Sequence, residues 1–307
     1  MKKILVATEK PFAKQAVDNI KKLVESAGYE FLLLEKYQSA DELIKAAENV
    51  NAIIIRSDKI TKEVIDAANK LEIVVRAGAG YDNVDLQASS DKNIVVMNTP
   101  GQNSNAVAEL ALGMMVYQAR NGFDGNSGTE LRGKTLGIHA YGNVGKYVAK
   151  IAKGFGMKVY AFDPFVKKKS IKKDKVKAVK SVEKLYSKCQ YISLHIPANE
   201  KTKNSINYDL LSLMPENAVL VNTARKEVIN ESELLKIMAE KKNFSYLSDI
   251  APDCKTDFEQ NFSGRFLFTT KKMGAQTSEA NINSGIAAAQ QIINFFKKGD
   301  KTFQVNK

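Results

Sequence analysis

Residues 135–150 read TLGIHAYGNVGKYVAK, and this stretch decides the fold expected for the second half of the chain. The apolar run from Leu136 to Ala140 predicts a strand, and the residues that follow Gly142 predict a helix. The six residues A-Y-G-N-V-G between them match the pattern G-x-G-x-x-G, with alanine in the first position. A glycine turn that opens a helix presents free N–H groups to a ligand, and this favours a bound phosphate.

The spacing around this motif indicates which phosphate ligand to expect. Gly142 would let the backbone approach a pyrophosphate, and Gly145 would let the helix pack against the strand. The next apolar run, KVYAFD, ends on Asp163, 18 residues after Gly145. A carboxylate at that place binds the ribose hydroxyls of NAD and repels the additional phosphate of NADP. The pattern therefore predicts an NAD site rather than a purely structural turn, while Lys167–Lys169 keep NADP open as an alternative.

Strand and helix patterns alternate along the whole chain. In the first third, strands and the helices between them are predicted at 3–8, 13–28, 30–35, 39–50, 52–57, 61–71 and 73–78. A long helix at 105–121 and a glycine-rich loop at 122–134 precede the motif, and a helix at 278–299 closes the chain. This alternation predicts an α/β architecture with two doubly wound parallel sheets and a boundary near 98–100.

The composition sets the class of protein. The chain has 307 residues, 44% of them hydrophobic, which is enough for two domains with separate cores. The N-terminal apolar run, Ile4 to Ala7, is too short for a signal peptide, and no stretch reaches the roughly 18 apolar residues of a membrane span. Cys189 and Cys254 lie far apart without a metal-ligand pattern, so we expect no bound metal and a reducing, cytoplasmic setting.

The net charge of +12 comes almost wholly from lysine, because only six of the 46 basic residues are arginine. The densest run is VKKKSIKKDKVKAVK, from Val166 to Lys180. It lacks the arginine forks and interleaved aromatic side chains with which proteins bind nucleic acids. We therefore interpret the run as a solvated surface and expect neither a nucleic-acid nor a membrane partner.

Five segments follow one another along nearly the whole chain: RAGAGYDNVD (76–85), NTPGQNSNAVAEL (98–110), AYGNVG (140–145), VNTARKEVIN (221–230) and TTKKMGAQTSEA (269–280). In this order they resemble the substrate loop, the hinge, the NAD loop, the arginine segment and the histidine segment of the D-isomer-specific 2-hydroxyacid dehydrogenases. The resemblance implies a Rossmann-type NAD-binding domain at 99–280. It also implies a flavodoxin-like substrate-binding domain made of 1–98 with 281–307, and a homodimer formed through the helix near 106–120.

Within the family, the resemblance is closest to a short branch that oxidises 3-phospho-D-glycerate to 3-phosphohydroxypyruvate with NAD, the first step of serine synthesis. The chain ends soon after its last predicted helix, so we expect it to lack the C-terminal regulatory domain of longer relatives. Two alternatives remain open at this point. One is a glyoxylate or hydroxypyruvate reductase of the same fold, and the other is a non-catalytic, NAD-sensing co-repressor that uses the lysine run for a partner.

The resemblance also implies roles for individual residues. Arg225 would hold the carboxylate and the carbonyl of the substrate, and His195 would lie beside the cofactor without transferring a proton. The residues implied to contact the cofactor are Tyr141, Gly142, Asn143, Val144, Gly145, Asp163, His195, Ile196, Pro197, Thr202, Thr223, Ala224, Asp249 and Gly274. Those implied to contact the substrate are Lys10, Arg56, Ser57, Arg76, Ala77, Gly78 and Asn103. Lys10, Arg56 and Arg76 are the candidates for its phosphate, with ordinary surface ion pairs as the equal alternative.

One segment departs from the family pattern. The family usually has a histidine in T-P-H-I-G, paired with a glutamate about five residues after a strand-end aspartate. Here the register reads Thr270-Lys271-Lys272-Met273-Gly274, and Cys254 stands five residues after Asp249. The only histidines, His139 and His195, lie elsewhere. The chain is therefore either an inactive relative or one in which Lys272 is the acid/base group.

The joint loss of histidine and glutamate favours the second interpretation. A histidine needs a carboxylate to fix its tautomer and raise its pKa, whereas a lysine, whose pKa starts at about 10.4, needs its pKa lowered. Burial, together with the charges of Arg225 and Lys271, is expected to lower the pKa of Lys272, and a glutamate would raise it. The hypothesis is that Arg225 polarises the substrate carbonyl while Lys272 exchanges a proton with its oxygen.

Overall fold

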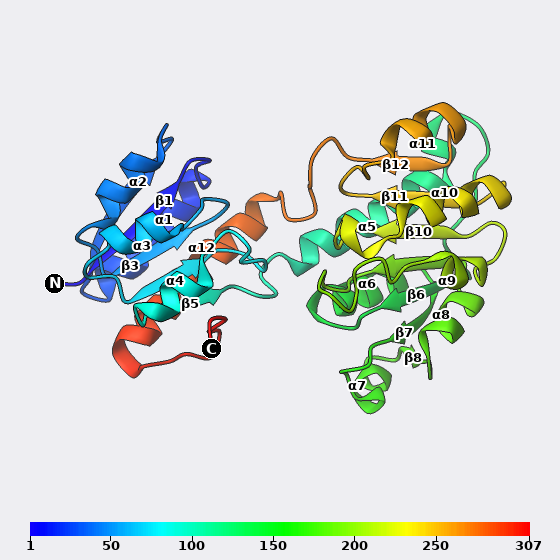
Figure 1. The fold of residues 1–307 in the computed structure, drawn as a ribbon. Helices are drawn as coiled ribbons and strands as arrows, with labels where there is room; N and C mark the ends of the chain where they lie inside the picture. The colour runs from blue at the N-terminus through cyan, green and yellow to red at the C-terminus, as the bar shows by residue number, and fades with distance from the viewer. The chain divides into compact units, whose positions relative to one another are not determined.

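The computed structural model describes residues 1–307, and the chain divides into two compact units. Unit 1 contains residues 1–103 and 277–307, and unit 2 contains residues 104–276 (Figure 1). The predicted boundary at 280/281 would cut the last helix, α12 (Ser278–Lys298), near its start. The structure keeps α12 whole with unit 1, because its apolar face packs on that unit's sheet.

Unit 1 is built on a five-stranded parallel sheet with the strand order β2-β1-β3-β4-β5. This order confirms the predicted flavodoxin-like architecture, in which the order of strand addition reverses between β1 and β3. Besides α12, its elements are β1 (Lys3–Thr8), α1 (Lys14–Ser26), β2 (Glu30–Glu35), α2 (Ala40–Ala47), β3 (Ala52–Ile55), α3 (Lys62–Ala67), β4 (Ile73–Arg76), α4 (Leu86–Asp91) and β5 (Val95–Asn98). The strand β5 and the short helix α4 were not predicted.

Two apolar cores lie on the two faces of this sheet, because parallel strands are covered by helices on both sides. Successive residues of a strand point to opposite faces, so Leu5 and Ile53 belong to one core and Ile4 and Ile54 to the other. The second core is covered by α1 and α12, which approach closely at Gly285. A Cβ atom at that position would lie 2.8 Å from Ile20 Cδ1. No helix of the structure combines the length and the apolar composition needed to cross a bilayer.

Unit 2 is built on a seven-stranded parallel sheet with the strand order β12-β11-β10-β9-β6-β7-β8. Counted from β6, this is the Rossmann order 3-2-1-4-5-6 with one further strand, as predicted. Its elements are α5 (Ser104–Ala119), η1 (Asn121–Phe123), β6 (Thr135–His139), α6 (Asn143–Gly154), β7 (Lys158–Phe162), α7 (Lys168–Lys173), β8 (Lys177–Ala178), α8 (Val182–Lys188), β9 (Tyr191–Leu194), α9 (Tyr208–Ser212), β10 (Val219–Asn222), η2 (Lys226–Val228), α10 (Glu231–Glu240), β11 (Ser245–Ser248), α11 (Lys255–Asn261) and β12 (Phe266–Phe268).

The glycine motif joins β6 to α6 through a tight turn. A Cβ atom on Gly145 would lie 2.4 Å from the carbonyl oxygen of Ala140, so only glycine lets α6 pack this closely against the strand. Ala140 occupies the first glycine position of the motif and has a φ of +78°. That conformation is unfavourable for any residue with a Cβ atom.

The strain at Ala140 predicts that Ala140→Gly stabilises the protein. Removing the Cβ atom relieves about 1–2 kcal/mol, and the larger entropy loss of glycine returns about 0.5–1 kcal/mol, which leaves a gain of about 0.5–1 kcal/mol. Urea unfolding measures the difference. Ala239→Gly, at an exposed position of α10, is the matched control and should lower stability by a similar amount. Equal losses in the two variants would show that Ala140 is not strained.

Candidate active site

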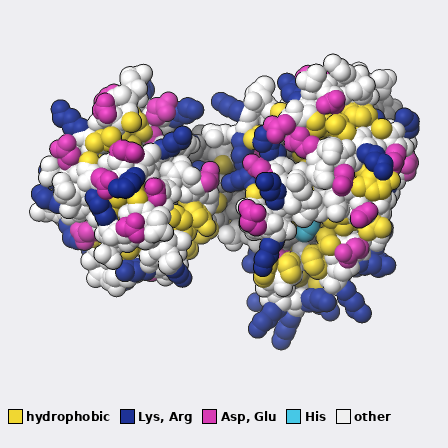
Figure 2. Space-filling model, in the orientation of Figure 1, with side chains coloured by type: hydrophobic (Ala, Val, Ile, Leu, Met, Phe, Trp, Pro, Cys, Tyr) yellow, Lys and Arg dark blue, Asp and Glu magenta, His cyan; other side chains and the backbone are white.

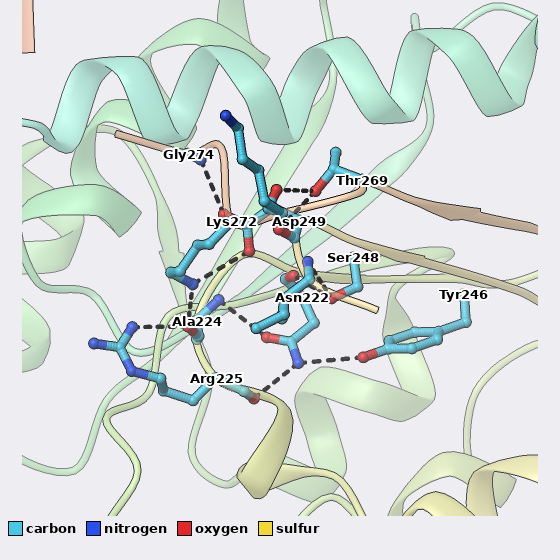
Figure 3. Close-up of polar contacts among 11 residues, drawn as sticks. Asn222, Ala224, Arg225, Tyr246, Ser248, Asp249, Thr269, Lys272 and Gly274 are labelled. Atoms are coloured by element: carbon cyan, nitrogen blue, oxygen red, sulfur yellow. Dashed lines mark hydrogen bonds and ion pairs between the residues drawn. The ribbon is translucent and has the colours of Figure 1, made fainter. Parts of the chain in front are cut away.

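The loops that leave β10, β11 and β12 bring Arg225, Asp249 and Lys272 together (Figure 3). All three residues lie just beyond the carboxyl ends of parallel strands, at the edge where doubly wound sheets bind their ligands. They are far apart in the sequence but meet because β10, β11 and β12 are neighbours in the sheet. The structure thus unites both predicted catalytic residues with one residue predicted to bind the cofactor.

The side chain of Lys272 lies between two acceptors. Its Nζ donates to the carbonyl oxygen of Ala224 at 2.7 Å and to Oδ1 of Asp249 at 3.2 Å. The guanidinium of Arg225 donates to the same carbonyl oxygen from Nη1, at 3.0 Å. Two cationic side chains therefore meet at one backbone oxygen, close enough to act on one small ligand (Figure 3).

Asp249 is a buried carboxylate whose side chain is only 1% exposed. Oδ2 accepts the N–H of Gly274 at 3.0 Å, while Oδ1 accepts the amine of Lys272. The backbone oxygen of Asp249 accepts the hydroxyl of Thr269 at 2.7 Å, which ties the loop after β11 to the loop after β12. The carboxylate is thus held from both sides by the segment that carries Lys272.

Burial lowers the pKa of Lys272 below the value of a free lysine, Asp249 opposes this, and the charge of Arg225 adds to the lowering. The direction agrees with the prediction, and so do the roles of burial and of Arg225. Lys271, in contrast, is exposed and is not among the groups that shift this pKa. A carboxylate nevertheless lies beside Lys272, because Asp249 contacts its amine from the end of β11.

Asn222 organises the turn between β10 and Arg225, a role that the sequence analysis missed. Its side chain is fully buried, accepts the N–H of Ala224 at 3.0 Å and donates to the carbonyl oxygen of Arg225 at 2.9 Å. These bonds aim the carbonyl group of Ala224 at the two cations. A polar residue that directly follows the apolar run of a buried strand, as Asn222 does, was the signal in the sequence.

The turn between β6 and α6 has the properties of a dinucleotide site. Gly142 is the N-cap of α6 and offers no side chain to its free N–H groups, and the space where its Cβ atom would stand is open. Asp163 follows β7 and accepts the N–H groups of Tyr141, Phe165 and Val166 at 2.8, 2.8 and 3.1 Å. The carboxylate is therefore fixed beside the turn, as a ligand of a ribose would need to be. Asn143 and Val144 form the first turn of α6.

The segments after β9 and β10 hold the other predicted cofactor residues. Burial lowers the pKa of His195 to about 3, which favours the neutral ring. The hydroxyl of Thr202 donates to the carbonyl of Pro197 at 2.6 Å and closes the loop that begins at Ile196. The hydroxyl of Thr223 is buried and has no partner within the protein. Such an orphaned group fits a polar ligand at this edge.

The predicted substrate residues of unit 1 cluster at the carboxyl ends of β1, β3 and β4. Arg56 donates to the carbonyls of Lys10 and Pro11 and to Oδ1 of Asn281, while Arg76 donates from Nε to the carbonyl of Arg56. The guanidinium of Arg76 lies so close over Gly78 that a Cβ atom there would be 1.5 Å from Nη1.

The remaining predicted substrate groups of unit 1 differ in how open they are to a ligand. The N–H groups of Ala77 and Gly78 already donate to Ile55 and Arg76, so contacts between them and a substrate stay a prediction that requires these bonds to open. Ser57 is exposed after β3, and Asn103 is the last residue of the first segment of this unit.

Two surface features bear on other ligands. Every lysine of the run 166–180 is exposed, and Figure 2 shows the basic side chains gathered over α7. Asp174 of this run accepts the hydroxyl of Tyr141 at 3.1 Å and thereby joins the run to the glycine turn. No three His, Cys, Asp or Glu side chains come close enough together to hold a metal ion.

Comparisons with known proteins match this architecture. Residues 87–263 match the family model described as the D-isomer specific 2-hydroxyacid dehydrogenase, NAD binding domain. The crystal structure of cofactor (NAD+)-bound 3-phosphoglycerate dehydrogenase in Entamoeba histolytica is similar, with a TM-score of 0.88 and 48% identity, over 100% of this chain and 99% of that chain.

Two curated proteins are similar at the level of sequence. The chain is 33% identical to D-3-phosphoglycerate dehydrogenase of Methanocaldococcus jannaschii over 82% of its own length, but it spans only 51% of that protein. It is also 33% identical to hydroxypyruvate reductase of Thermotoga maritima, over 86% of this chain and 90% of that protein. The chain thus spans about half the length of the first relative and nearly all of the second.

The position of Asp163 predicts that Asp163→Asn weakens binding of NADH by about tenfold to a hundredfold, because a hydrogen bond to a charged acceptor contributes about 1.5–3 kcal/mol. The same change should narrow the difference between NADH and NADPH, since the charge that repels the additional phosphate is gone. Fluorescence titration with both nucleotides measures this, with Asp257→Asn in the exposed first turn of α11 as the control. An unchanged preference would place the ribose elsewhere.

Proposed function

The chain belongs to the D-isomer specific 2-hydroxyacid dehydrogenase family, and we propose that it oxidises 3-phospho-D-glycerate to 3-phosphohydroxypyruvate with NAD, the first step of serine biosynthesis. The observation that carries the proposal is the meeting of the Lys272 amine and the Arg225 guanidinium on the carbonyl of Ala224. The 48% identity with an NAD+-bound 3-phosphoglycerate dehydrogenase supports the choice of substrate.

The side chains of Arg225 and Lys272 have different roles at the C2 oxygen of the substrate. NAD supplies the hydride chemistry when bound, so the protein needs no nucleophile. Arg225 binds the carboxylate and polarises the C2 oxygen, which its planar fork of N–H donors suits. In the oxidation, Lys272 accepts the proton of the C2 hydroxyl group as C2 of the substrate becomes a carbonyl carbon. In the reduction, the ammonium returns that proton to the oxygen.

The residues proposed to hold the cofactor lie at one edge of unit 2. Gly142, Asn143 and Val144 would receive the pyrophosphate on the start of α6, and Asp163 would bind the ribose. Thr223, with its unpartnered hydroxyl, supports a polar contact near β10. The substrate phosphate is proposed to bind the basic groups of unit 1, with Arg56 and Arg76 as its principal ligands.

A reductase of hydroxypyruvate is the second candidate, because the similar protein of Thermotoga maritima carries that name and is covered over 90% of its length. This substrate is the same 2-oxo acid without the phosphate, so it makes no use of the arginines in unit 1. A panel of 3-phosphohydroxypyruvate, hydroxypyruvate and glyoxylate separates the two, and Arg56→Ala should affect only the phosphorylated substrate.

We also propose a homodimer, formed through α5 and the segment after it. Tyr117 and Phe123 form an edge-to-face pair with ring centroids 5.4 Å apart, although Phe123 is 66% exposed. An exposed aromatic pair of this kind is typical of an interface. Light scattering after size exclusion should give twice the mass of one chain, and a monomer at assay concentration would contradict the proposal.

Both cysteines are free, which supports the proposed cytoplasmic setting.

The role of Lys272 predicts that Lys272→Ala lowers the rate of NADH oxidation with 3-phosphohydroxypyruvate by about 100-fold to 10,000-fold. Lys271→Ala removes the neighbouring, exposed lysine and should leave the rate unchanged, which controls for the loss of charge. Wild-type turnover by Lys272→Ala would remove the lysine from the mechanism. Binding of NADH without turnover of any 2-oxo acid would favour a cofactor-sensing protein instead.

The pH profile is a second measure of the same assignment. Because the pKa of Lys272 is lowered, the amine loses its proton below the value of about 10.4 for free lysine. The reduction needs the protonated form and should decline as the pH rises through this pKa, whereas the oxidation should gain over the same range. A profile in which both directions change in the same sense would contradict the assignment.

A further inference from the structure

We propose that Asp249 is the positioning residue of the reaction: it holds the amine of Lys272 so that one position of the nitrogen always faces the substrate. The inference rests on the proposed function of Lys272 as acid and base. It differs from the expectation that Asp249 binds the cofactor. The carboxylate that the family places five residues further along the chain is here supplied by the strand-end aspartate itself.

The number of donors on the amine fixes its orientation. A protonated lysine has three N–H groups, and two of them are used by the carbonyl oxygen of Ala224 and by Oδ1 of Asp249. The third N–H can donate to the C2 oxygen of the substrate. After that proton leaves, the two remaining N–H groups keep their acceptors, and the lone pair occupies the third position. The nitrogen therefore changes from acid to base without turning.

The acceptors are rigid, which makes this orientation reproducible from one turnover to the next. Asp249 is held by the N–H of Gly274 on Oδ2 and by the hydroxyl of Thr269 on its backbone oxygen, and its side chain is 1% exposed. A Cβ atom on Gly274 would lie 2.8 Å from Oδ2, so any larger residue would push the carboxylate away. Gly274 thus gives the carboxylate the room it needs beside Lys272.

Three charged groups face the amine of Lys272 and set its charge. Arg225 precedes η2 and lowers its pKa, as burial does, while Asp249 after β11 and Glu227 within η2 raise it. Asp249 therefore counteracts the burial of the amine. A lysine that burial alone kept neutral could accept a proton in the oxidation. It would hold no proton to donate at the start of the reduction.

Asp249→Asn tests the proposal with little change in shape. An amide has one acceptor oxygen for two donors, Lys272 and Gly274, so at least one of the two contacts is lost. We expect kcat to fall by about 10–100-fold, as is common when a supporting hydrogen bond is removed, while the KM for NADH stays within about twofold. The alkaline limb of the reduction should also move to lower pH, because a group that raises the pKa of Lys272 has gone.

Two further variants make the experiment specific. Gly274→Ala keeps the carboxylate but displaces it and should produce the same fall in kcat, which provides a second test if Asp249→Asn folds poorly. Asp253→Asn removes an exposed aspartate that pairs with Lys226, and it should leave kcat and the pH limb unchanged. NADH titration and thermal unfolding establish that each variant is folded and binds the cofactor.

The outcomes separate the inference from the function on which it rests. If Lys272→Ala is inactive while Asp249→Asn and Gly274→Ala keep the wild-type kcat and pH limb, the positioning role is wrong and Lys272 acts alone. If Asp249→Asn raises only the KM for NADH, Asp249 is a cofactor ligand. If Lys272→Ala itself stays active, the proposed function fails first.

Discussion

A buried carboxylate at the end of β11 is the feature on which the active site depends. A carboxylate that is buried without partners is unfavourable, so Asp249, with a side chain only 1% exposed, needs the groups around it. Gly274 and Lys272 supply two hydrogen bonds to the carboxylate, and both come from the loop after β12. The loop is thus held where its lysine meets Arg225. The hydrogen bond that partners the carboxylate of Asp249 therefore also fixes the position of the Lys272 amine.

The geometry of the parallel sheet explains why these groups can meet at all. Strands that run in the same direction end at the same edge, and the seven-stranded order puts the ends of β10, β11 and β12 side by side. Each of them is followed by a loop that carries one polar group of the site. The same edge presents the glycine turn after β6 and Asp163 after β7, so cofactor and substrate chemistry draw on one scaffold.

A lysine in place of a histidine changes what its surroundings must do. Imidazole titrates near neutrality and needs orientation, whereas an amine needs both orientation and a lowered pKa. Burial and Arg225 provide the lowering, and Asp249 limits it. A carboxylate beside the amine is therefore compatible with a lysine mechanism, although the sequence pattern did not indicate one. It comes from the end of β11 rather than from the position where the family pattern has glutamate.

The amino-acid sequence by itself determined the architecture of both units, because apolar periodicity and the glycine turn are local signals. Most strands, the order of motifs, and the candidates Arg225 and Lys272 were readable from short segments, whereas the strand β5 and the short helix α4 were not. The sequence did not reveal the partner of Lys272, since Asp249 lies 23 residues away and is brought near only by the pairing of β11 with β12. Nor did it reveal the roles of Asn222 and of the Ala224 carbonyl. Every residue has a backbone carbonyl, so the residue type does not indicate which carbonyl will accept a hydrogen bond. Such contacts arise only when strands distant along the chain become neighbours, and tertiary structure alone decides which ones do.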